Sequence, residues 1–546
     1  MPQIHFHRCP DSALRSLPWF LGGFLACSML LSIARPAQCR KTPPEQRWWK
    51  AEHQDFTVFC NIGPMATEKY AKRLNDIAAG IATVVPRSDL RDGKPLHLFV
   101  VRDDEDFKYL GAQTSANASG YYRPESFAHL LVVNASAADA HHVLNHEFVH
   151  AYFVPRLPEE PRWLHEGLAE YYSVIEVRSG QARLGKSIPH HIEALERLPP
   201  MDYLYMTHLS TKQFFEMGPK RRAVFYAQAW ALTHYLFEGG RSHPQSMGEF
   251  LQGLASGQTL TASFASAYRM SRQDIDREFR RYVDRAYYAD RRVDLPGEYA
   301  ADWKPRAEEM SRDEVLLRIS ELGLASRAAR EQTLPLLREL ITLDADTHEG
   351  ARLLGVCLVR SDSTAEAIEW FEKAIELHPN DGLLHGLLGL WLLRRRPGAD
   401  AVERGCAHLR TAAMRIPGNV EVQVSLAKAL RVIGEMDSAF VAYEAALSVH
   451  PWMVRVTEEY IDARAQVGQL REARSILDDR LMPFATEHCI MRVESRLALH
   501  YEARFDEVLR DEGEAGAKAF MVEAIQATHS PDVRARLAQI LQRLKR

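Results

Sequence analysis

The stretch His146-Glu147-Phe148-Val149-His150 is the strongest local signal in the sequence. On a helix, side chains four positions apart lie on the same face, so the two histidines can reach one metal ion. Glu147 then lies beside an open coordination position, where it can take a proton from water. Two histidines at this spacing also occur on solvated helix faces, so a metal site requires a third ligand elsewhere in the chain.

A second helix is expected to open at Pro161, shortly after Pro155 has ended the first one. It reads Arg162-Trp163-Leu164-His165-Glu166-Gly167-Leu168-Ala169-Glu170-Tyr171 and presents Glu166 and Glu170 on one face. A catalytic zinc site takes three protein ligands and keeps one position open, and two histidines with one glutamate are a known set. The two helices together therefore predict a zinc site.

The two segments, HEFVH followed by PRWLHEGLAEY, resemble the gluzincin metallopeptidases, the thermolysin-like zincins, and in particular bacterial peptidase-MA-like domains. Residues 226–236 and 270–279 strengthen the likeness, which covers residues 48–288. The resemblance implies a zincin-like fold, zinc as the cofactor and peptide-bond hydrolysis as the reaction. It implies His146, His150 and Glu166 as zinc ligands, Glu147 as the general base and Glu170 as a partner that orients a ligating histidine.

The identity of the third ligand has alternatives. Fifteen residues separate His150 from Glu166, fewer than in thermolysin, whereas nineteen separate it from Glu170, which matches the thermolysin spacing. The motif context favours Glu166, and we give context more weight because loops between helices vary freely in length. His165 is a third alternative, but it points off the face that the two glutamates share.

Other residues are candidates for substrate binding. Tyr226 either donates a hydrogen bond to the oxyanion of the reaction or is a core aromatic of an amphipathic helix. The strand expected at residues 128–133 is a candidate edge strand, which would bind an extended peptide by main-chain pairing. Gly120-Tyr121-Tyr122 directly precedes it and is a candidate lining of the same cleft.

The first half of the chain has an α+β pattern. Strands are expected at residues 56–60, 96–101 and 128–133, with a helix at 66–84, and only helices and loops are expected beyond residue 135. We therefore predict a zincin-like metallopeptidase domain at residues 41–294. Residues 295–312 are charged and contain Pro296, Gly297 and Pro305, which predicts an interdomain linker.

The second half of the chain repeats. Pro379, Pro417 and Pro451 follow similar helical segments at intervals of 38 and 34 residues, and Gly434 and Gly468 are also 34 apart. This period resembles the tetratricopeptide repeat, an all-α helix-pair solenoid. We predict repeats at residues 313–482 and a C-terminal helical cap at 483–546. Each repeat contacts mainly its neighbours, so the solenoid is expected to fold without the first half and to bind a protein partner.

The first forty residues differ from the rest. Arg8 and Arg15 precede an apolar run at residues 17–34, which is typical of a secretory signal. The run is long for a signal peptide, so an uncleaved membrane anchor is the alternative. Residues 1–40 therefore predict an exported protein, periplasmic or extracellular, that is either released or tethered at its N-terminus.

Composition excludes several classes of protein. The chain has 546 residues, a formal net charge of −4 and no long basic run, which argues against nucleic-acid binding. Its 7 cysteines form no CxxC pair, which argues against a disulfide scaffold and a cysteine-based zinc ribbon. The prediction is an exported zinc metallopeptidase with a docking solenoid. The alternative is a catalytically inactive zincin-like scaffold that acts as a tetratricopeptide binding protein.

Overall fold

The computed structural model describes residues 41–85, 94–110, 119–157, 161–207, 209, 211–285, 287–297, 303–326, 329–361, 363–393 and 398–542. The expected signal or anchor at residues 1–40 lies outside these ranges. No helix within them combines the length and the apolar character that a membrane span requires.

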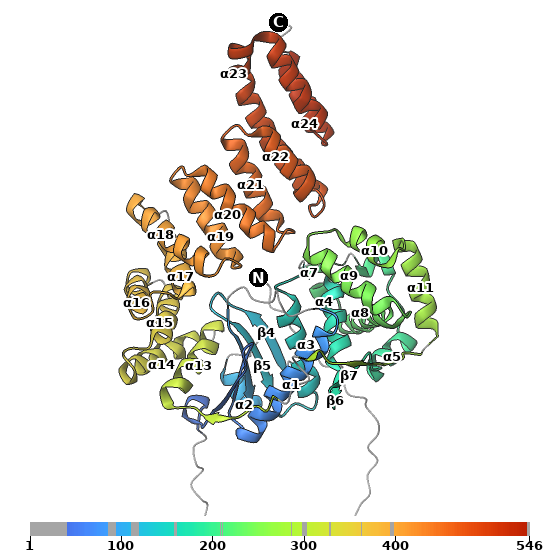
Figure 1. The fold of residues 1–546 in the computed structure, drawn as a ribbon, viewed down its shortest axis with the longest axis vertical. Coiled ribbons are helices and arrows are strands. Elements are labelled where there is room, and N and C mark those ends of the chain that lie inside the picture. Colours follow the sequence, from blue (N-terminus) through green and yellow to red (C-terminus); the bar gives the residue numbers. More distant parts are fainter. Residues whose placement is uncertain are drawn as a thin grey trace, which may run out of the picture.

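A mixed β-sheet forms the centre of the first half of the chain (Figure 1). Its strands lie in the order β4-β5-β3-β2-β1-β9, with β2, β3 and β5 parallel and the other neighbours antiparallel. Their bounds are β1 Trp49–Glu52, β2 Thr57–Cys60, β3 Leu96–Val101, β4 Gly120–Pro124, β5 His129–Asn134 and β9 Glu308–Glu309. The three strands predicted from the sequence are thus present, and the fold is α+β as expected.

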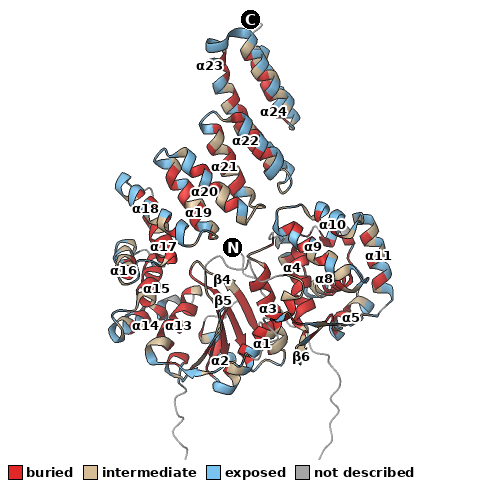
Figure 2. Cartoon of the chain, viewed as in Figure 1, coloured by how far each residue is buried: buried red, intermediate tan, exposed pale blue. Residues whose placement is uncertain are grey.

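Both faces of this sheet are buried (Figure 2). Alternate residues of a strand point to opposite faces, so each strand contributes to two cores. One face packs against α1 (Pro64–Ala82) and α3 (Ala140–Phe153) through a core that includes Val58, Leu98, Val100, Leu131, Val133, Leu74 and Leu144. The opposite face contributes Phe59, Phe99, Val101, Leu130 and Val132 to a separate core. That second core is completed by the start of the solenoid.

A helical subdomain follows α3 and carries the rest of the predicted site. Its helices are α4 Arg162–Ser173, α5 Pro189–Arg197, α6 Tyr203–Thr207, α7 Thr211–Glu216, α8 Pro219–Glu238, α9 His243–Ala255, α10 Leu260–Tyr268 and α11 Arg272–Asp284. Helix α4 packs between α3 and α8. Gly167 makes the approach to α8 possible, because a Cβ atom there would lie 2.5 Å from the carbonyl oxygen of Ala229. The ligand-bearing face of α4 is thereby held against α3.

The expectation of no strand beyond residue 135 is wrong. Strands β6 (Glu176–Arg178), β7 (Gln181–Leu184) and β8 (Arg291–Asp294) form a small antiparallel sheet, and β9 joins the central sheet. These strands are short and rich in charged residues, so they lack the apolar alternation by which a strand is recognised in a sequence. Two of them border or lie within the segment expected to be a linker.

The edge of the central sheet also differs from the expectation. Strand β5, which covers the expected edge at residues 128–133, pairs with β3 on one side and with β4 on the other. In the part of the sheet that the structure describes, the edge strand on this side is β4, which contains Gly120, Tyr121 and Tyr122. Arg123 and Pro124 obscure this strand in the sequence, because proline is more typical of turns and edges than of strand interiors.

The second half of the chain is a solenoid of helix pairs (Figure 1). Its helices are α13 Arg312–Ala325, α14 Arg330–Leu343, α15 His348–Arg360, α16 Thr364–Leu377, α17 Gly382–Leu392, α18 Ala399–Arg415, α19 Val420–Val432, α20 Met436–Val449, α21 Val454–Gln466, α22 Leu470–Ile476, the π-helix Leu477–Leu481, α23 Glu487–Ala527 and α24 Pro531–Leu541.

The repeat period predicted from the sequence is confirmed. Helices α15, α17, α19 and α21 begin at intervals of 34, 38 and 34 residues. Gly434 and Gly468 occupy the turns inside two successive pairs with φ angles of 83° and 79°, which glycine adopts without strain.

The solenoid begins on the sheet itself. Helix α13 and its neighbours cover the second face, where Leu316 and Leu353 share a core with Phe99 and Val132. A buried polar contact crosses the same boundary, with His97 Nδ1 2.7 Å from Glu321 Oε2. The first repeats and the sheet therefore share one core, and the solenoid has a fixed position relative to it.

Candidate metal centre

Helix α3 carries the first three predicted site residues. His146, Glu147 and His150 are each no more than 3% exposed, because α3 lies between the sheet and α4. The Nε2 atoms of the two histidines lie 3.1 Å apart, as their spacing on one helix face predicts. Glu147 points toward the sheet edge, where its Oε2 accepts a hydrogen bond of 2.9 Å from the backbone N–H of Tyr122.

Helix α4 brings Glu166 to the same place. Glu166 Oε2 lies 3.5 Å from His146 Nε2 and 3.5 Å from His150 Nε2. The other carboxylate oxygen, Oε1, lies 3.0 Å from Arg162 Nη2, one helical turn earlier. The Arg162 guanidinium in turn lies over the ring of Phe214, 4.2 Å from its centroid. Arg162 thus holds one oxygen of Glu166 and leaves the other facing the histidines.

These three ligand atoms have the spacing of a tetrahedral metal site. Bonds of about 2.1 Å at tetrahedral angles place ligand atoms about 3.4 Å apart, and the distances here are 3.1, 3.5 and 3.5 Å. Glu166 Oε2 and Glu147 Oε1 are buried and have no hydrogen-bond partner among the described residues. The buried His146, His150 and Glu166 cluster is consistent with an HExxH-type zinc site, and its donor set suits zinc.

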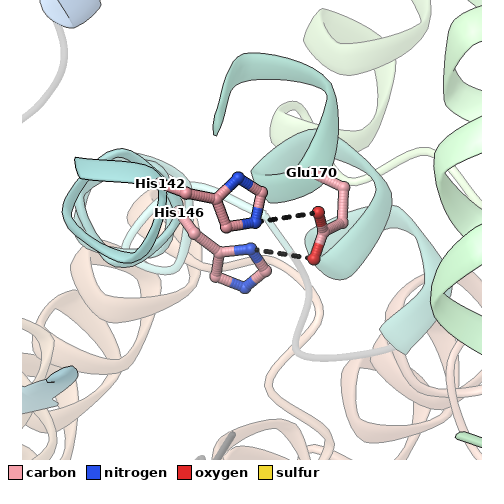
Figure 3. Close-up of side chains that lie close together, drawn as sticks. All are labelled: His142, His146 and Glu170. Carbon is pink, nitrogen blue, oxygen red and sulfur yellow. Dashed lines mark ion pairs between the residues drawn. The ribbon is translucent and has the colours of Figure 1, made fainter. Parts of the chain in front are cut away.

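Glu170 faces both His142 and His146 (Figure 3). It contacts the Nδ1 atom of His146, whereas Glu166 lies at the Nε2 atom. Its Oε1 is 3.2 Å from His146 Nδ1, so the two nitrogens of one imidazole face two different glutamates. A carboxylate on the second nitrogen fixes the ring orientation and the tautomer of a ligating histidine. The structure therefore places Glu166 at the Nε2 atoms of both histidines. Glu170 contacts only His146 of these two, at its Nδ1 atom.

The charges of the site are coupled. Burial raises the pKa of Glu147 to about 7, with the nearby Glu166 adding to the effect. Burial by itself lowers the pKa of His146, but Glu170 and Glu166 outweigh it and raise that pKa to about 10. Burial also lowers the pKa of His150. A carboxyl whose pKa is near neutral pH can both accept and return a proton, which suits the role predicted for Glu147.

Glu166 and Glu170 remain ionised at neutral pH. Burial alone raises the pKa of Glu166, but Arg162 and His150 outweigh it and lower the pKa below its ordinary range. The pKa of Glu170 is lowered in the same way, against burial, by His191 and His146. Both carboxylates are therefore available as anionic ligands at neutral pH.

Two further predicted residues lie nearby. Tyr226, on α8, is half-buried with its ring 5.7 Å from that of Phe214, and its pKa is raised by burial and then by Glu166. His165 is buried on α4 but belongs to neither of the two possible metal-binding groups among the described residues.

Three residues of the site were not predicted from the sequence. His142 lies four positions before His146, and Arg162 lies four positions before Glu166, so helical spacing could have indicated both. His191, on α5, has its Nε2 3.0 Å from Glu170 Oε2. No local pattern connects His191 to the other residues, because the chain folds back between α4 and α5 to bring it there.

Comparison with known proteins finds a family model that matches the part of the chain around the site. Residues 137–256 match a family model described as "Protein of unknown function (DUF1570)". The matched range contains all of α3, α4, α5 and α8, and so all the site residues named above except Tyr122 of β4. A search of the curated proteins finds no match to the chain.

Solved structures that resemble the chain cover its repeats. One is YrrB, described as a TPR protein with an unusual peptide-binding site, which is 18% identical, with 33% of this chain and 90% of that chain covered and a TM-score of 0.29. Another is MamA from Desulfovibrio magneticus RS-1, at 16% identity, 33% and 94% coverage and a TM-score of 0.28. Both TM-scores are low, so the repeat fold rests on the helix pairs and their period.

Proposed function

We propose that the chain is a zinc-dependent metallopeptidase that hydrolyses peptide bonds at the site between α3, α4 and the edge strand β4. The observation that carries the proposal is the set of three buried ligand atoms, at 3.1, 3.5 and 3.5 Å from one another, with a buried glutamate beside them. Zinc bound there would act as a Lewis acid on water and on the scissile carbonyl.

The chain's own residues have distinct roles in this reaction. His146, His150 and Glu166 hold the ion, and Glu170 orients His146 through its Nδ1 atom. Glu147 accepts a proton from the attacking water and returns it to the leaving amine. Its Oε1 supports this role, because this buried atom has no hydrogen-bond partner in the described part of the chain.

Substrate binding is assigned to the edge strand and to α8. Strand β4 has one unpaired side in the described sheet, and its Tyr122 N–H already contacts Glu147. An extended peptide pairing with this edge would run past the base. Tyr226 is proposed to donate a hydrogen bond to the oxyanion of the tetrahedral intermediate.

The solenoid is proposed to dock a protein partner or substrate, since helix-pair repeats offer extended binding surfaces. Residues 1–40 are proposed to direct export to the periplasm or the cell exterior, with or without a lasting membrane tether. In this arrangement the first repeats, which share a core with the sheet, keep the docking surface in a fixed position relative to the site.

The test is Glu147→Gln, which preserves the size of the side chain and removes the base. The parent chain should cleave members of a peptide library, and Glu147→Gln should keep its zinc but lose at least about a hundredfold in kcat/KM. Glu196→Gln, at an exposed position of α5, is the matched control and should change nothing. If Glu147→Gln cleaves as well as the parent, the assigned base is wrong. If the parent binds zinc and cleaves nothing, the inactive scaffold is the better account.

A further inference from the structure

The carboxylate of Glu170, on α4, contacts residues of two other helices. Its Oε1 lies 3.2 Å from His146 Nδ1, on α3, and its Oε2 lies 3.0 Å from His191 Nε2, on α5. Oε2 also lies 3.4 Å from His142 Nε2, a second residue of α3 (Figure 3). The role proposed above for Glu170, which is to orient His146, uses only Oε1 and leaves the contacts of Oε2 without a function.

The contact of Oε2 with His191 is the shorter and the more buried of its two contacts. The side chain of His191 is 4% exposed, whereas that of His142 is 29% exposed, and water weakens an exposed contact by screening it. A carboxylate oxygen repels a bare ring nitrogen, so the distance of 3.0 Å indicates that His191 Nε2 carries a proton. Neither atom has a hydrogen-bond partner among the described residues, so each depends on this contact to compensate for its burial.

His191 approaches Glu170 from a rigid support. Helix α5 begins at Pro189, and the backbone N–H of His191 donates a hydrogen bond of 3.0 Å to the carbonyl oxygen of Ile188. The His191 ring lies 5.7 Å from that of Trp230, a fully buried residue of α8. Helix α8 packs against both α4 and α5, and so fixes Glu170 and His191 relative to each other.

Fixing Oε2 bears on the metal centre through the orientation of the carboxylate. A glutamate held by one oxygen alone can rotate about its last bonds, so Oε1 would present itself to His146 in several orientations. A second contact at Oε2 restricts that rotation. The acceptor at the outer nitrogen of a ligating histidine sets the orientation of its ring, and ligands that are already oriented bind more tightly because less freedom is lost.

We propose that His191 is a positioning residue of the metal centre, which holds Glu170 Oε2 so that Oε1 stays at the outer nitrogen of His146. The inference rests on the proposed function, in which His146 is a zinc ligand, but it does not require peptide cleavage. Helix α5 carries none of the assigned ligands, and it strengthens zinc binding through two side chains in series, Glu170 and His146.

The experiment measures the zinc affinity of the full chain by competition with a chromophoric chelator. His191→Phe keeps an aromatic ring beside Trp230 and removes the N–H. Its zinc affinity should fall about threefold to tenfold, less than the 10–100-fold typical of a partner that contacts the ligating histidine directly. His191→Gln should restore most of the affinity, because its amide N–H can reach Oε2.

His190→Phe is the matched control. His190 is the neighbouring residue of α5, it is exposed, and no ion pair links it to Glu170 in the described part of the chain. The variant should bind zinc as the parent does. If His191→Phe does not fold, His191→Asn replaces it, because the shorter amide cannot reach Oε2.

A double-mutant cycle distinguishes positioning from a general effect on packing. Glu170→Ala removes both carboxylate oxygens, and in that background His191→Phe should change zinc affinity by less than about twofold. An equal loss in both backgrounds overturns the proposal, and so does a His191→Phe variant that binds zinc as tightly as the parent.

The outcomes also separate this proposal from the peptidase. Zinc binding that weakens in His191→Phe, in a parent that cleaves no peptide, would refute the peptidase and support the positioning role. Peptide cleavage by a parent whose zinc affinity does not depend on His191 would do the reverse. A parent that binds no zinc would overturn both.

Discussion

The shared core of the sheet and the solenoid predicts that the half of the chain with the candidate metal centre does not fold alone. A chain that ends at Tyr288 lacks β9 and α13–α17, and so uncovers the sheet face that carries Phe59, Phe99, Leu130 and Val132. Each of these side chains is at most 3% exposed in the full chain. Burial of a large apolar side chain contributes about 1.5–3 kcal/mol. Exposure of these four side chains therefore lowers the free energy of unfolding by about 6–12 kcal/mol. That is comparable to the total stability of a typical domain, about 5–15 kcal/mol.

The assay compares three chains that begin at residue 41, by urea unfolding and by zinc content. The chain ending at Tyr288 should be aggregated or unfolded and should lose its metal. A chain ending at Leu393 keeps the helices that cover the sheet and is the matched control, since a separate core cluster accounts for most of the later repeats. It should bind as much zinc as the full chain. A chain ending at Tyr288 that unfolds cooperatively and retains its zinc would refute the shared core.

Two further predictions concern single carboxylates. Glu166→Gln should lower zinc affinity more than Glu170→Gln. For Glu170→Gln a fall of about 10–100-fold is expected, because Glu170 acts on the ion only through His146. The opposite ranking in equilibrium dialysis would make Glu170 the ligand. Glu321 should make the free energy of unfolding depend on pH: burial alone raises its pKa, but His97 and Arg318 lower it to about 2 from 4.5. Its ionised form stabilises the fold above pH 4.5, and about 3 kcal/mol should be lost between pH 4.5 and 2. Glu321→Gln should flatten that decline in acid-unfolding curves, and an unchanged curve would contradict the assignment.

The sequence was sufficient to predict features that depend on local spacing. The two helices of the metal centre were expected from His146, His150 and Glu166, and the structure brings these three residues together. The repeats were expected from a period of 34 residues, which the helix starts reproduce. The pairing of His146 with His150 and the repeat period follow from spacing within one helix or one repeat unit. Glu166 lies on a second helix, and it was preferred to Glu170 because of the resemblance of its motif, against the spacing.

Features that depend on tertiary contacts were not predicted. Strands β8 and β9 carry mostly charged residues and gain their partners only when distant parts of the chain meet. The sheet face around Phe99 is as apolar as the face that packs on α1, so both faces need a cover. Apolar character does not specify which helices provide it, and the sequence therefore did not indicate α13. His191 reaches Glu170 only because α5 packs against α8, a contact without any local signature.

The position of Glu170 connects the candidate metal centre to α5. One oxygen faces His146, and the other faces His142 and His191. A single carboxylate thus links the ligand set of α3 to α5, so a change in its second pair of contacts reaches the candidate metal centre through one side chain. The outer oxygen of Glu166 instead contacts Arg162, on its own helix. A substitution in α5 is therefore expected to reach the ligand set through Glu170 rather than through Glu166.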